Sequence, residues 1–268
     1  MPHAKLSAVC AWMLATGLVF LSACSTTTPD PTAAWSPNKI YAEAKDEVSL
    51  GAFDKAVALF EKLEGRAAGT PLAQQAQLDK AYAHYKAGEP VLAIATLDRF
   101  IKLHPASPAL DYALYLKGIV NFNDDLGLFS SLTRQDLAER DQKAAKDSFE
   151  SFKELVSRFP DSRYAPEASQ RMNYIVNSLA QSEVHVARYY FERRAYLAAI
   201  NRAQTAITDY QGVPALEEAL FIMVKSYDAL GMTALRDDTQ RVLEKNYPQT
   251  PYLVQGFKSR NDPWWKIW

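Results

Sequence analysis

Side chains that could perform catalysis or hold a metal are few in this sequence, and they are scattered. The histidines are His3, His84, His104 and His185. None has a partner at metal-ligand spacing, and the HExxH, GxSxG, P-loop and GxGxxG motifs are absent. The adjacent carboxylates Asp124-Asp125 and Asp237-Asp238 would point apart on a helix or be solvated in a loop. We therefore predict a protein that works by binding, with no catalytic residue, metal or cofactor.

Cys24 is the exception, because its sequence context indicates that its thiol carries lipid. Residues 1–23 hold Lys5, an apolar stretch and then small residues, which is typical of a secretory signal peptide. The sequence Leu21-Ser22-Ala23-Cys24 resembles the lipobox of bacterial lipoproteins. That resemblance implies cleavage before Cys24, an S-diacylglycerol on its sulfur and an N-linked acyl chain such as palmitate on its new amino group.

The residues after the cysteine predict where the protein resides. Ser25 follows Cys24, and in the sorting rule of many Gram-negative bacteria a residue other than Asp at this position implies the outer membrane. We expect the domain to be lipid-anchored at the periplasmic face. Residues 24–36 are rich in Ser, Thr and Pro without an apolar period, so they predict a flexible tether.

Composition limits what the remaining chain can be. The 268 residues are 48% hydrophobic and 23% charged, and with only 10 Gly and 14 Pro they favour helix over sheet. The formal net charge is −1, which leaves no basic excess to bind a phosphate backbone, so nucleic acid is not an expected partner. Because both cysteines precede residue 25, the body of the protein can form no disulfide and must fold by apolar burial.

Short motifs recur at about 37 residues and indicate helical hairpins. Gly51 and Gly88 suit a tight turn between helices, and Ala56, Ala93 and Ala199 are small where two helices would cross. Prolines near the end of each unit stop its second helix. The period is close to that of the tetratricopeptide repeat, so we predict an all-α superhelical solenoid of about five hairpins, or ten helices.

The hairpins are expected at 37–66, 71–105, 108–160, 163–211 and 214–248. Residues 123–141 form an insertion in the third hairpin, and the first helix of the fourth should be unusually long, since 166–194 has no internal Gly or Pro after Pro166. The predicted solenoid therefore spans 37–250, with an N-terminal half at 37–160 and a C-terminal half at 163–250. A tail follows at 251–268, and its aromatic end either packs back on the last hairpin or docks elsewhere.

Stacked hairpins leave a concave groove, and such grooves usually bind an extended or helical peptide. Helix phase places Tyr41, Leu78, Tyr82 and Tyr85 at the groove of the first two repeats. At repeat positions such aromatic residues are more often part of the core than of a binding site. We nevertheless predict that the groove holds a polypeptide partner, because its shape suits an extended or helical peptide.

Several segments together resemble the ComL family of lipoproteins, the BamD subunits of the β-barrel assembly (Bam) machine. The segments are LSAC at 21–24, PNKIYAEA at 37–44, QQAQLD at 74–79, AYAHYK at 81–86, DRFIKLHP at 98–105, DYALYLKG at 111–118, ARYYFER at 187–193 and NR at 201–202. The resemblance runs from Cys24 to about Pro248. Two features depart from the family, namely Arg194, where Gly is usual, and the Trp-rich tail.

The resemblance implies five repeats at the periplasmic face of the outer membrane and a set of partners. The C-terminal half would dock the last POTRA domain of the barrel protein BamA, and the N-terminal half would meet unfolded outer-membrane proteins. Other Bam lipoproteins would also bind. Arg202 falls on the family position that pairs with an acidic residue of BamA.

The sequence also allows two other functions. A different outer-membrane repeat lipoprotein, for instance one that coordinates peptidoglycan synthesis, would use the same hairpins. An enzyme such as a cell-wall hydrolase would need a catalytic domain, and the repeats leave no room for one between 37 and 250.

Overall fold

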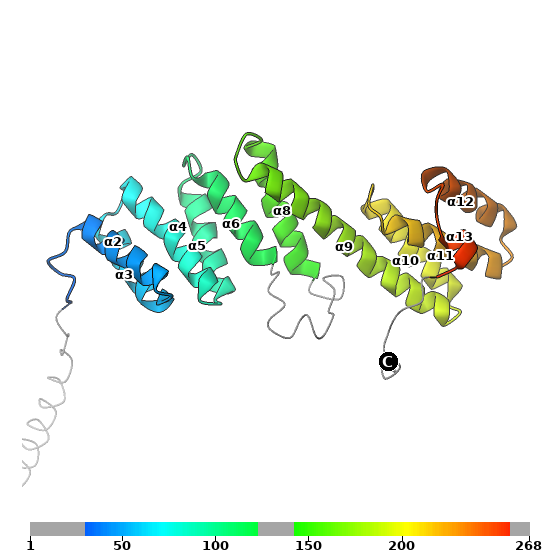
Figure 1. Cartoon of the computed structure of the whole chain (residues 1–268), viewed down its shortest axis with the longest axis horizontal. Helices are drawn as coiled ribbons and strands as arrows, with labels where there is room; N and C mark the ends of the chain where they lie inside the picture. The colour runs from blue at the N-terminus through cyan, green and yellow to red at the C-terminus, as the bar shows by residue number, and fades with distance from the viewer. Residues whose placement is uncertain (1–29, 123–141, 258–268) are drawn as a thin grey trace, which may run out of the picture.

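The computed structural model describes residues 30–122 and 142–257, and this part of the chain is a row of helical hairpins (Figure 1). The helices are α2 (Pro37–Ser49), α3 (Phe53–Arg66), α4 (Pro71–Lys86), α5 (Pro90–Leu103), α6 (Leu110–Phe122), α8 (Gln142–Arg158), α9 (Ala165–Glu192), α10 (Tyr196–Asp209), α11 (Leu216–Ala229), α12 (Thr233–Asn246) and α13 (Tyr252–Gln255). Ten of them pair as five hairpins in chain order, which confirms the predicted fold class.

Local signals explain where the helices begin and where the chain turns between them. Ser36 and Thr70 cap α2 and α4 by accepting a hydrogen bond from the backbone N–H three residues on, and a proline occupies the first turn of both helices. The turns within hairpins need a left-handed residue, which Gly51 and Gly88 supply at φ of 76° and 78°. Arg194 takes the same conformation at φ of 62°, so this turn forms without a glycine.

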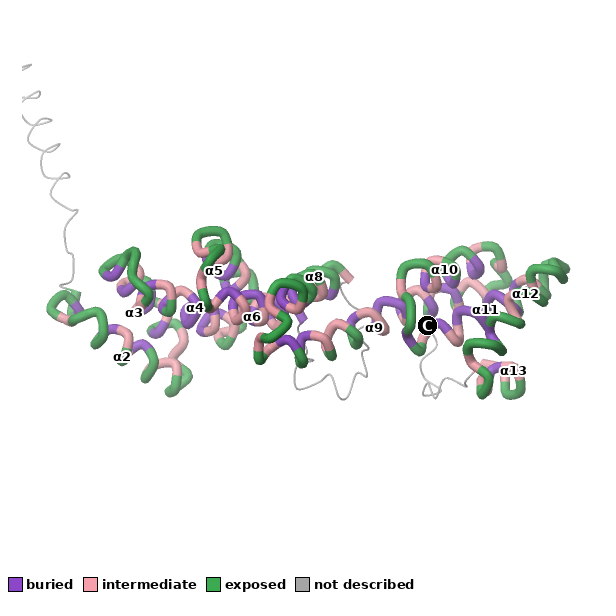
Figure 2. The backbone as a smooth tube through the Cα atoms, turned by 90° about the horizontal axis from the view of Figure 1, so that it is seen from above, coloured by how far each residue is buried: buried purple, intermediate pink, exposed green. Residues whose placement is uncertain are grey.

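The helices of each hairpin occupy different sides of the row. Figure 2 shows α5, α8 and α10 along one side and α2 and α9 along the opposite side, where α13 also lies. We call the side of α2, α4, α6, α9 and α11 the first-helix face, and the other side the second-helix face. The fourth hairpin has the expected long first helix, because α9 runs for 28 residues.

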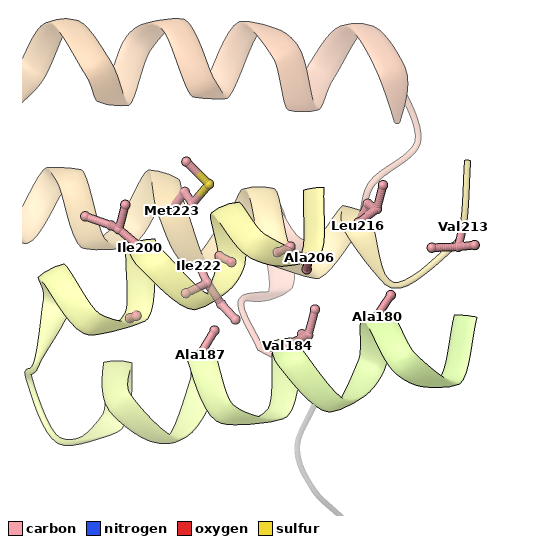
Figure 3. Packing of buried hydrophobic residues seen from close by; sticks show 12 residues of the cluster. Ala180, Val184, Ala187, Ile200, Ala206, Val213, Leu216, Ile222 and Met223 are labelled. Atoms are coloured by element: carbon pink, nitrogen blue, oxygen red, sulfur yellow. The ribbon is translucent and has the colours of Figure 1, made fainter. Parts of the chain in front are cut away.

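The core is continuous from hairpin to hairpin and combines alanines with large side chains. Ala56, Ala93 and Ala199 are buried where helices cross, as predicted, so their backbones approach closely. In the C-terminal half, Ala187 of α9 and Ile222 of α11 belong to one apolar cluster with residues of α10 (Figure 3). Each hairpin therefore completes its neighbour's core, which is the basis of solenoid stability.

The first described residues do not behave as a free tether. Asp30 accepts hydrogen bonds from Lys62 Nζ at 2.7 Å and from Arg66 Nη2 at 2.9 Å, and Arg66 also donates to the Thr32 carbonyl. The expectation of a flexible tether over 24–36 is thus wrong from Asp30 onward. The charged end of α3 holds this segment, and an absence of apolar period in the sequence does not reveal such polar contacts.

Candidate binding surfaces

The first-helix face of hairpins one and two has a polar network centred on Asp79. Tyr41 Oη donates to Asp79 Oδ2 at 2.8 Å, Lys45 Nζ lies 3.2 Å from Oδ1, and Gln75 Nε2 donates to Oδ2 at 3.3 Å. Burial raises the pKa of Tyr41, and the hydrogen bond to the Asp79 carboxylate raises it further. Tyr41, a predicted groove residue, is therefore fixed as a neutral phenol between α2 and α4.

Tyr82 and Tyr85, also predicted for the groove, are half-buried on α4 and pack against the cluster shared with α5 and α6. Each leaves part of its side chain exposed, as a contact surface requires. The structure thus places Tyr41 in the network around Asp79, a residue that the sequence did not single out, and Tyr82 and Tyr85 beside the cluster shared with α5 and α6.

Leu78 does not belong to this surface, and its prediction as a groove residue is wrong. Its side chain is only 1% exposed and lies in the core formed with α5 and α6. One residue of helix corresponds to about 100° of rotation, so an error of one position turns a groove residue into a core residue. Asp79, the next residue along, faces the network in its place.

Tyrosines continue along the first-helix side into the third and fourth hairpins. Tyr115 stacks on Tyr164 with ring centroids 4.6 Å apart, and Tyr115 Oη donates to Glu167 Oε2 at 2.7 Å. Tyr112 lies 5.6 Å from the Tyr164 ring. Burial raises the pKa of Tyr112 to about 12, and the Asp79 carboxylate adds to that shift. These contacts join the two groups into one aromatic surface from α2 to the start of α9.

This aromatic surface has the composition of a polypeptide contact site. Half-buried tyrosines give large contact areas at a small cost in side-chain entropy, and carboxylates beside them can accept hydrogen bonds from a peptide. Within residues 30–122 and 142–257, no group of three or more His, Cys, Asp or Glu side chains is placed to hold a metal. Tyr164 and Glu167 could not be foreseen from the sequence, because they meet α6 only through the fold.

Arg202 lies on α10, on the second-helix face of the C-terminal half. Its Nη1 is 3.0 Å from Glu183 Oε2 of α9, and its side chain is 48% exposed. A guanidinium has five N–H donors, so one contact with Glu183 orients the group and leaves donors for a partner. The position is suitable for an interface.

Open clefts also indent the second-helix face. One of them, of about 880 Å³, lies between α5, α6 and α8, with Ile94, Ile101 and Leu114 among its lining residues. An ion pair between Lys117 Nζ and Asp98 Oδ1 at 2.6 Å borders it. A second cleft of about 720 Å³ lies between α10, α11 and α12 and includes Leu220. Both have the open, partly apolar character of polypeptide contact sites rather than of an enclosed active site.

Several predicted features fall outside the described residues. These are the lipidation site Cys24, the insertion at 123–141 and the end of the tail at 258–268. In the described part, every helix is too short or too polar to cross a lipid bilayer.

Comparison with known families gives a match over most of the chain. The family described as "YfiO: Outer membrane lipoprotein" matches residues 33–243, which include the aromatic surface and Arg202. The match therefore extends over all five hairpins except the last residues of α12.

Curated relatives match over nearly their whole length. A protein of Neisseria meningitidis serogroup B named outer membrane protein assembly factor BamD is 47% identical over 92% of this chain and 95% of its own. A protein of the same name from Vibrio cholerae is 33% identical over 87% of this chain and 96% of its own. Among solved structures, the TPR-like repeats of a kinesin light chain from Podosopora anserina align with 11% identity over 80% of this chain and 96% of that chain, at a TM-score of 0.34.

Proposed function

The chain belongs to the YfiO family of outer membrane lipoproteins, and from this premise we propose that it is a non-catalytic scaffold of the outer-membrane β-barrel assembly complex. The observation that carries the proposal is the likeness to assembly factors across 92% of the chain, at 47% identity. Such a likeness includes every hairpin, so it concerns the whole scaffold and not one repeat.

The proposed mechanism is binding alone. The C-terminal half would hold the last POTRA domain of a BamA-like barrel protein, with Arg202 pairing an acidic residue of that partner. Charge-assisted contacts of Arg with a carboxylate are directional and strong, which suits them to fix the orientation of a partner. The half-exposed guanidinium, already oriented by Glu183, supports this role.

The N-terminal half would receive unfolded outer-membrane proteins on the aromatic surface between α2 and α9. Tyr41, Tyr82 and Tyr85 are the predicted residues that the structure leaves at least partly exposed. Other Bam lipoproteins would use the remaining surfaces. The lipids on Cys24 would keep these events next to the bilayer, since more than one acyl chain is needed for stable anchoring.

Purification of the full lipidated chain from outer membranes in mild detergent tests the proposal. We expect a barrel protein with POTRA domains to co-purify in a stoichiometric amount. If cell-wall synthases co-purify and the barrel protein does not, the proposal is wrong and a peptidoglycan scaffold replaces it.

A further inference from the structure

The segment after α12 turns back across the first-helix face of the last two hairpins. Figure 2 shows α13 on the side opposite to α10 and α12. We call residues 251–257 the strap. The strap contacts α11 through Tyr252 and reaches α9 through Phe257, so it crosses the face on which a solenoid of this kind presents its groove.

Tyr252 is the buried residue of the strap. Its ring stacks on Phe221 of α11 with centroids 5.3 Å apart and an interplanar angle of 29°. Its Oη donates to Glu218 Oε2 at 3.1 Å. Burial raises the pKa of Tyr252, and the Glu218 carboxylate raises it further, so the phenol remains a neutral donor.

Phe257 is the second anchor. Its ring lies 5.0 Å from Phe221 in a T-shaped arrangement and 5.2 Å from Phe191 of α9. The Arg188 guanidinium lies 5.5 Å from the centre of the Phe257 ring, within cation–π range. Both strap aromatics therefore meet a single aromatic floor.

The floor is built from the solenoid itself. Arg188 Nε donates to Glu218 Oε1 at 2.6 Å, and both side chains are largely buried, so the pair bridges α9 and α11. Phe221 belongs to the cluster that includes Leu220 and Leu243. We call Arg188, Phe191, Glu218 and Phe221 the seat.

Occupation of the seat depends on few strap residues. Leu253 is partly buried against the cluster around Phe221, whereas Val254 is 88% exposed and Gln255 is exposed, so only part of the strap is buried. Ordering seven residues costs conformational entropy that the burial of Tyr252 and the partial burial of Leu253 and Phe257 only partly offset. A tightly held strap would bury more of its length.

We propose that the seat is a peptide-binding site, that the strap is its resident ligand, and that it accepts in trans a peptide with a tyrosine followed five residues later by a phenylalanine. The phenol would donate to Glu218, and the second ring would lie between Phe191, Phe221 and Arg188. This site is separate from the aromatic surface of the N-terminal half, and it would be opened by release of the strap.

The test uses the full chain and a fluorescein-labelled synthetic peptide with the sequence of residues 249–258. In the wild type the strap competes at the high effective concentration of a linked ligand. The double variant Tyr252→Ala/Phe257→Ala empties the seat, and fluorescence anisotropy should show at least tenfold tighter peptide binding to it than to the wild type. A peptide with alanine at both aromatic positions should not bind either protein.

A control variant, a substitute variant and a cross-linking measurement keep the result specific. The variant Val254→Ala/Gln255→Ala changes the same strap at exposed positions and should bind the peptide as weakly as the wild type. Phe257→Ala alone serves if circular dichroism shows that the double variant is unfolded, and it should give an intermediate affinity. A benzophenone group on the peptide should cross-link to α9 and α11. Equal binding to wild type and variant, no binding to the emptied seat, or cross-links to other helices would overturn the proposal.

Discussion

Arg194 shows that a turn of this fold can form without glycine. Its φ of 62° is a conformation that costs an L-residue about 1–2 kcal/mol, and glycine adopts it freely. The turn persists because α9 and α10, the helices on both sides of it, pack against each other. This packing holds Arg194 in the backbone conformation that glycine adopts in the other turns.

Replacing Arg194 by glycine should therefore stabilise the protein. The relief of strain exceeds the added entropy of the unfolded chain, so we expect a gain of about 0.5–1 kcal/mol in the free energy of unfolding. Urea denaturation followed by circular dichroism measures it. Gly88→Ala, at φ of 78°, is the matched opposite change and should destabilise by about 1 kcal/mol. A loss of stability in Arg194→Gly would show that its side chain makes a stabilising contact.

Arg202→Glu should weaken capture of the barrel protein by tenfold or more, because attraction to an acidic partner becomes repulsion. The same change places a carboxylate beside Glu183, so its effect on folding needs a control. The double variant Arg202→Glu/Glu183→Arg restores a local ion pair but not the charge at position 202. We expect pull-down from both variants to stay weak. Recovery in the double variant would assign Arg202 a purely structural role.

Tyr112 and Tyr115 give the aromatic surface a dependence on alkaline pH. Burial raises the pKa of each to about 12, from an ordinary value near 10.0. The unfolded chain then loses these protons first, so their contribution is complete below pH 10 and falls as the pH rises toward 12. Urea midpoints at pH 9 and pH 11.5 should show this loss, and Tyr115→Phe should lose less than the wild type. An equal loss in both would contradict the assignment.

At the scale of elements, α6 and α8 cross closely at Gly118. Among the glycines of the described residues, this is the one at which an added Cβ would come nearest to a neighbouring side chain. A Cβ at Gly118 would lie 2.4 Å from the Phe152 ring, and Ser148 Oγ donates to the Gly118 carbonyl at 2.8 Å. Phe152 is buried and cannot move aside. The third hairpin is thus held by a close crossing.

Gly118→Ala should destabilise the protein by about 1–3 kcal/mol, because overpacking forces the two helices apart. Thermal unfolding by calorimetry would detect this. Gly65→Ala is the matched control, since this glycine is inside α3 with no atom within 4 Å of the added Cβ. There alanine should stabilise by up to about 1 kcal/mol through helix propensity. A neutral Gly118→Ala would mean that the crossing is loose.

Elements were predictable from the sequence because their signals are local. Glycine or its substitute at a turn, proline at a helix end and alanine at a crossing each act within a few residues, so five hairpins and the long α9 could be predicted. Whether a residue faces the surface or the core depends on its angular position around the helix axis. The sequence therefore misplaced Leu78 and missed its neighbour Asp79.

At the scale of the whole molecule, both ends of the described chain fold back onto the solenoid. Asp30 pairs with Lys62 and Arg66, and the hydrogen bonds from Lys62 and Thr32 keep the pKa of its carboxyl well below the usual range. Tyr252 and Phe257 occupy the seat at the other end. These contacts join residues more than 30 positions apart without any periodicity, and for that reason the sequence did not reveal them.

The proposed function likewise belongs to the whole chain, because the likeness to assembly factors extends over all hairpins. Conditional depletion of the protein in its own host is the most direct test. We predict that newly made outer-membrane β-barrel proteins then remain unfolded and protease-sensitive in the periplasm, and that a copy of the chain with intact Cys24 restores their insertion. Normal barrel insertion after depletion, with a defect confined to cell-wall synthesis, would contradict the account.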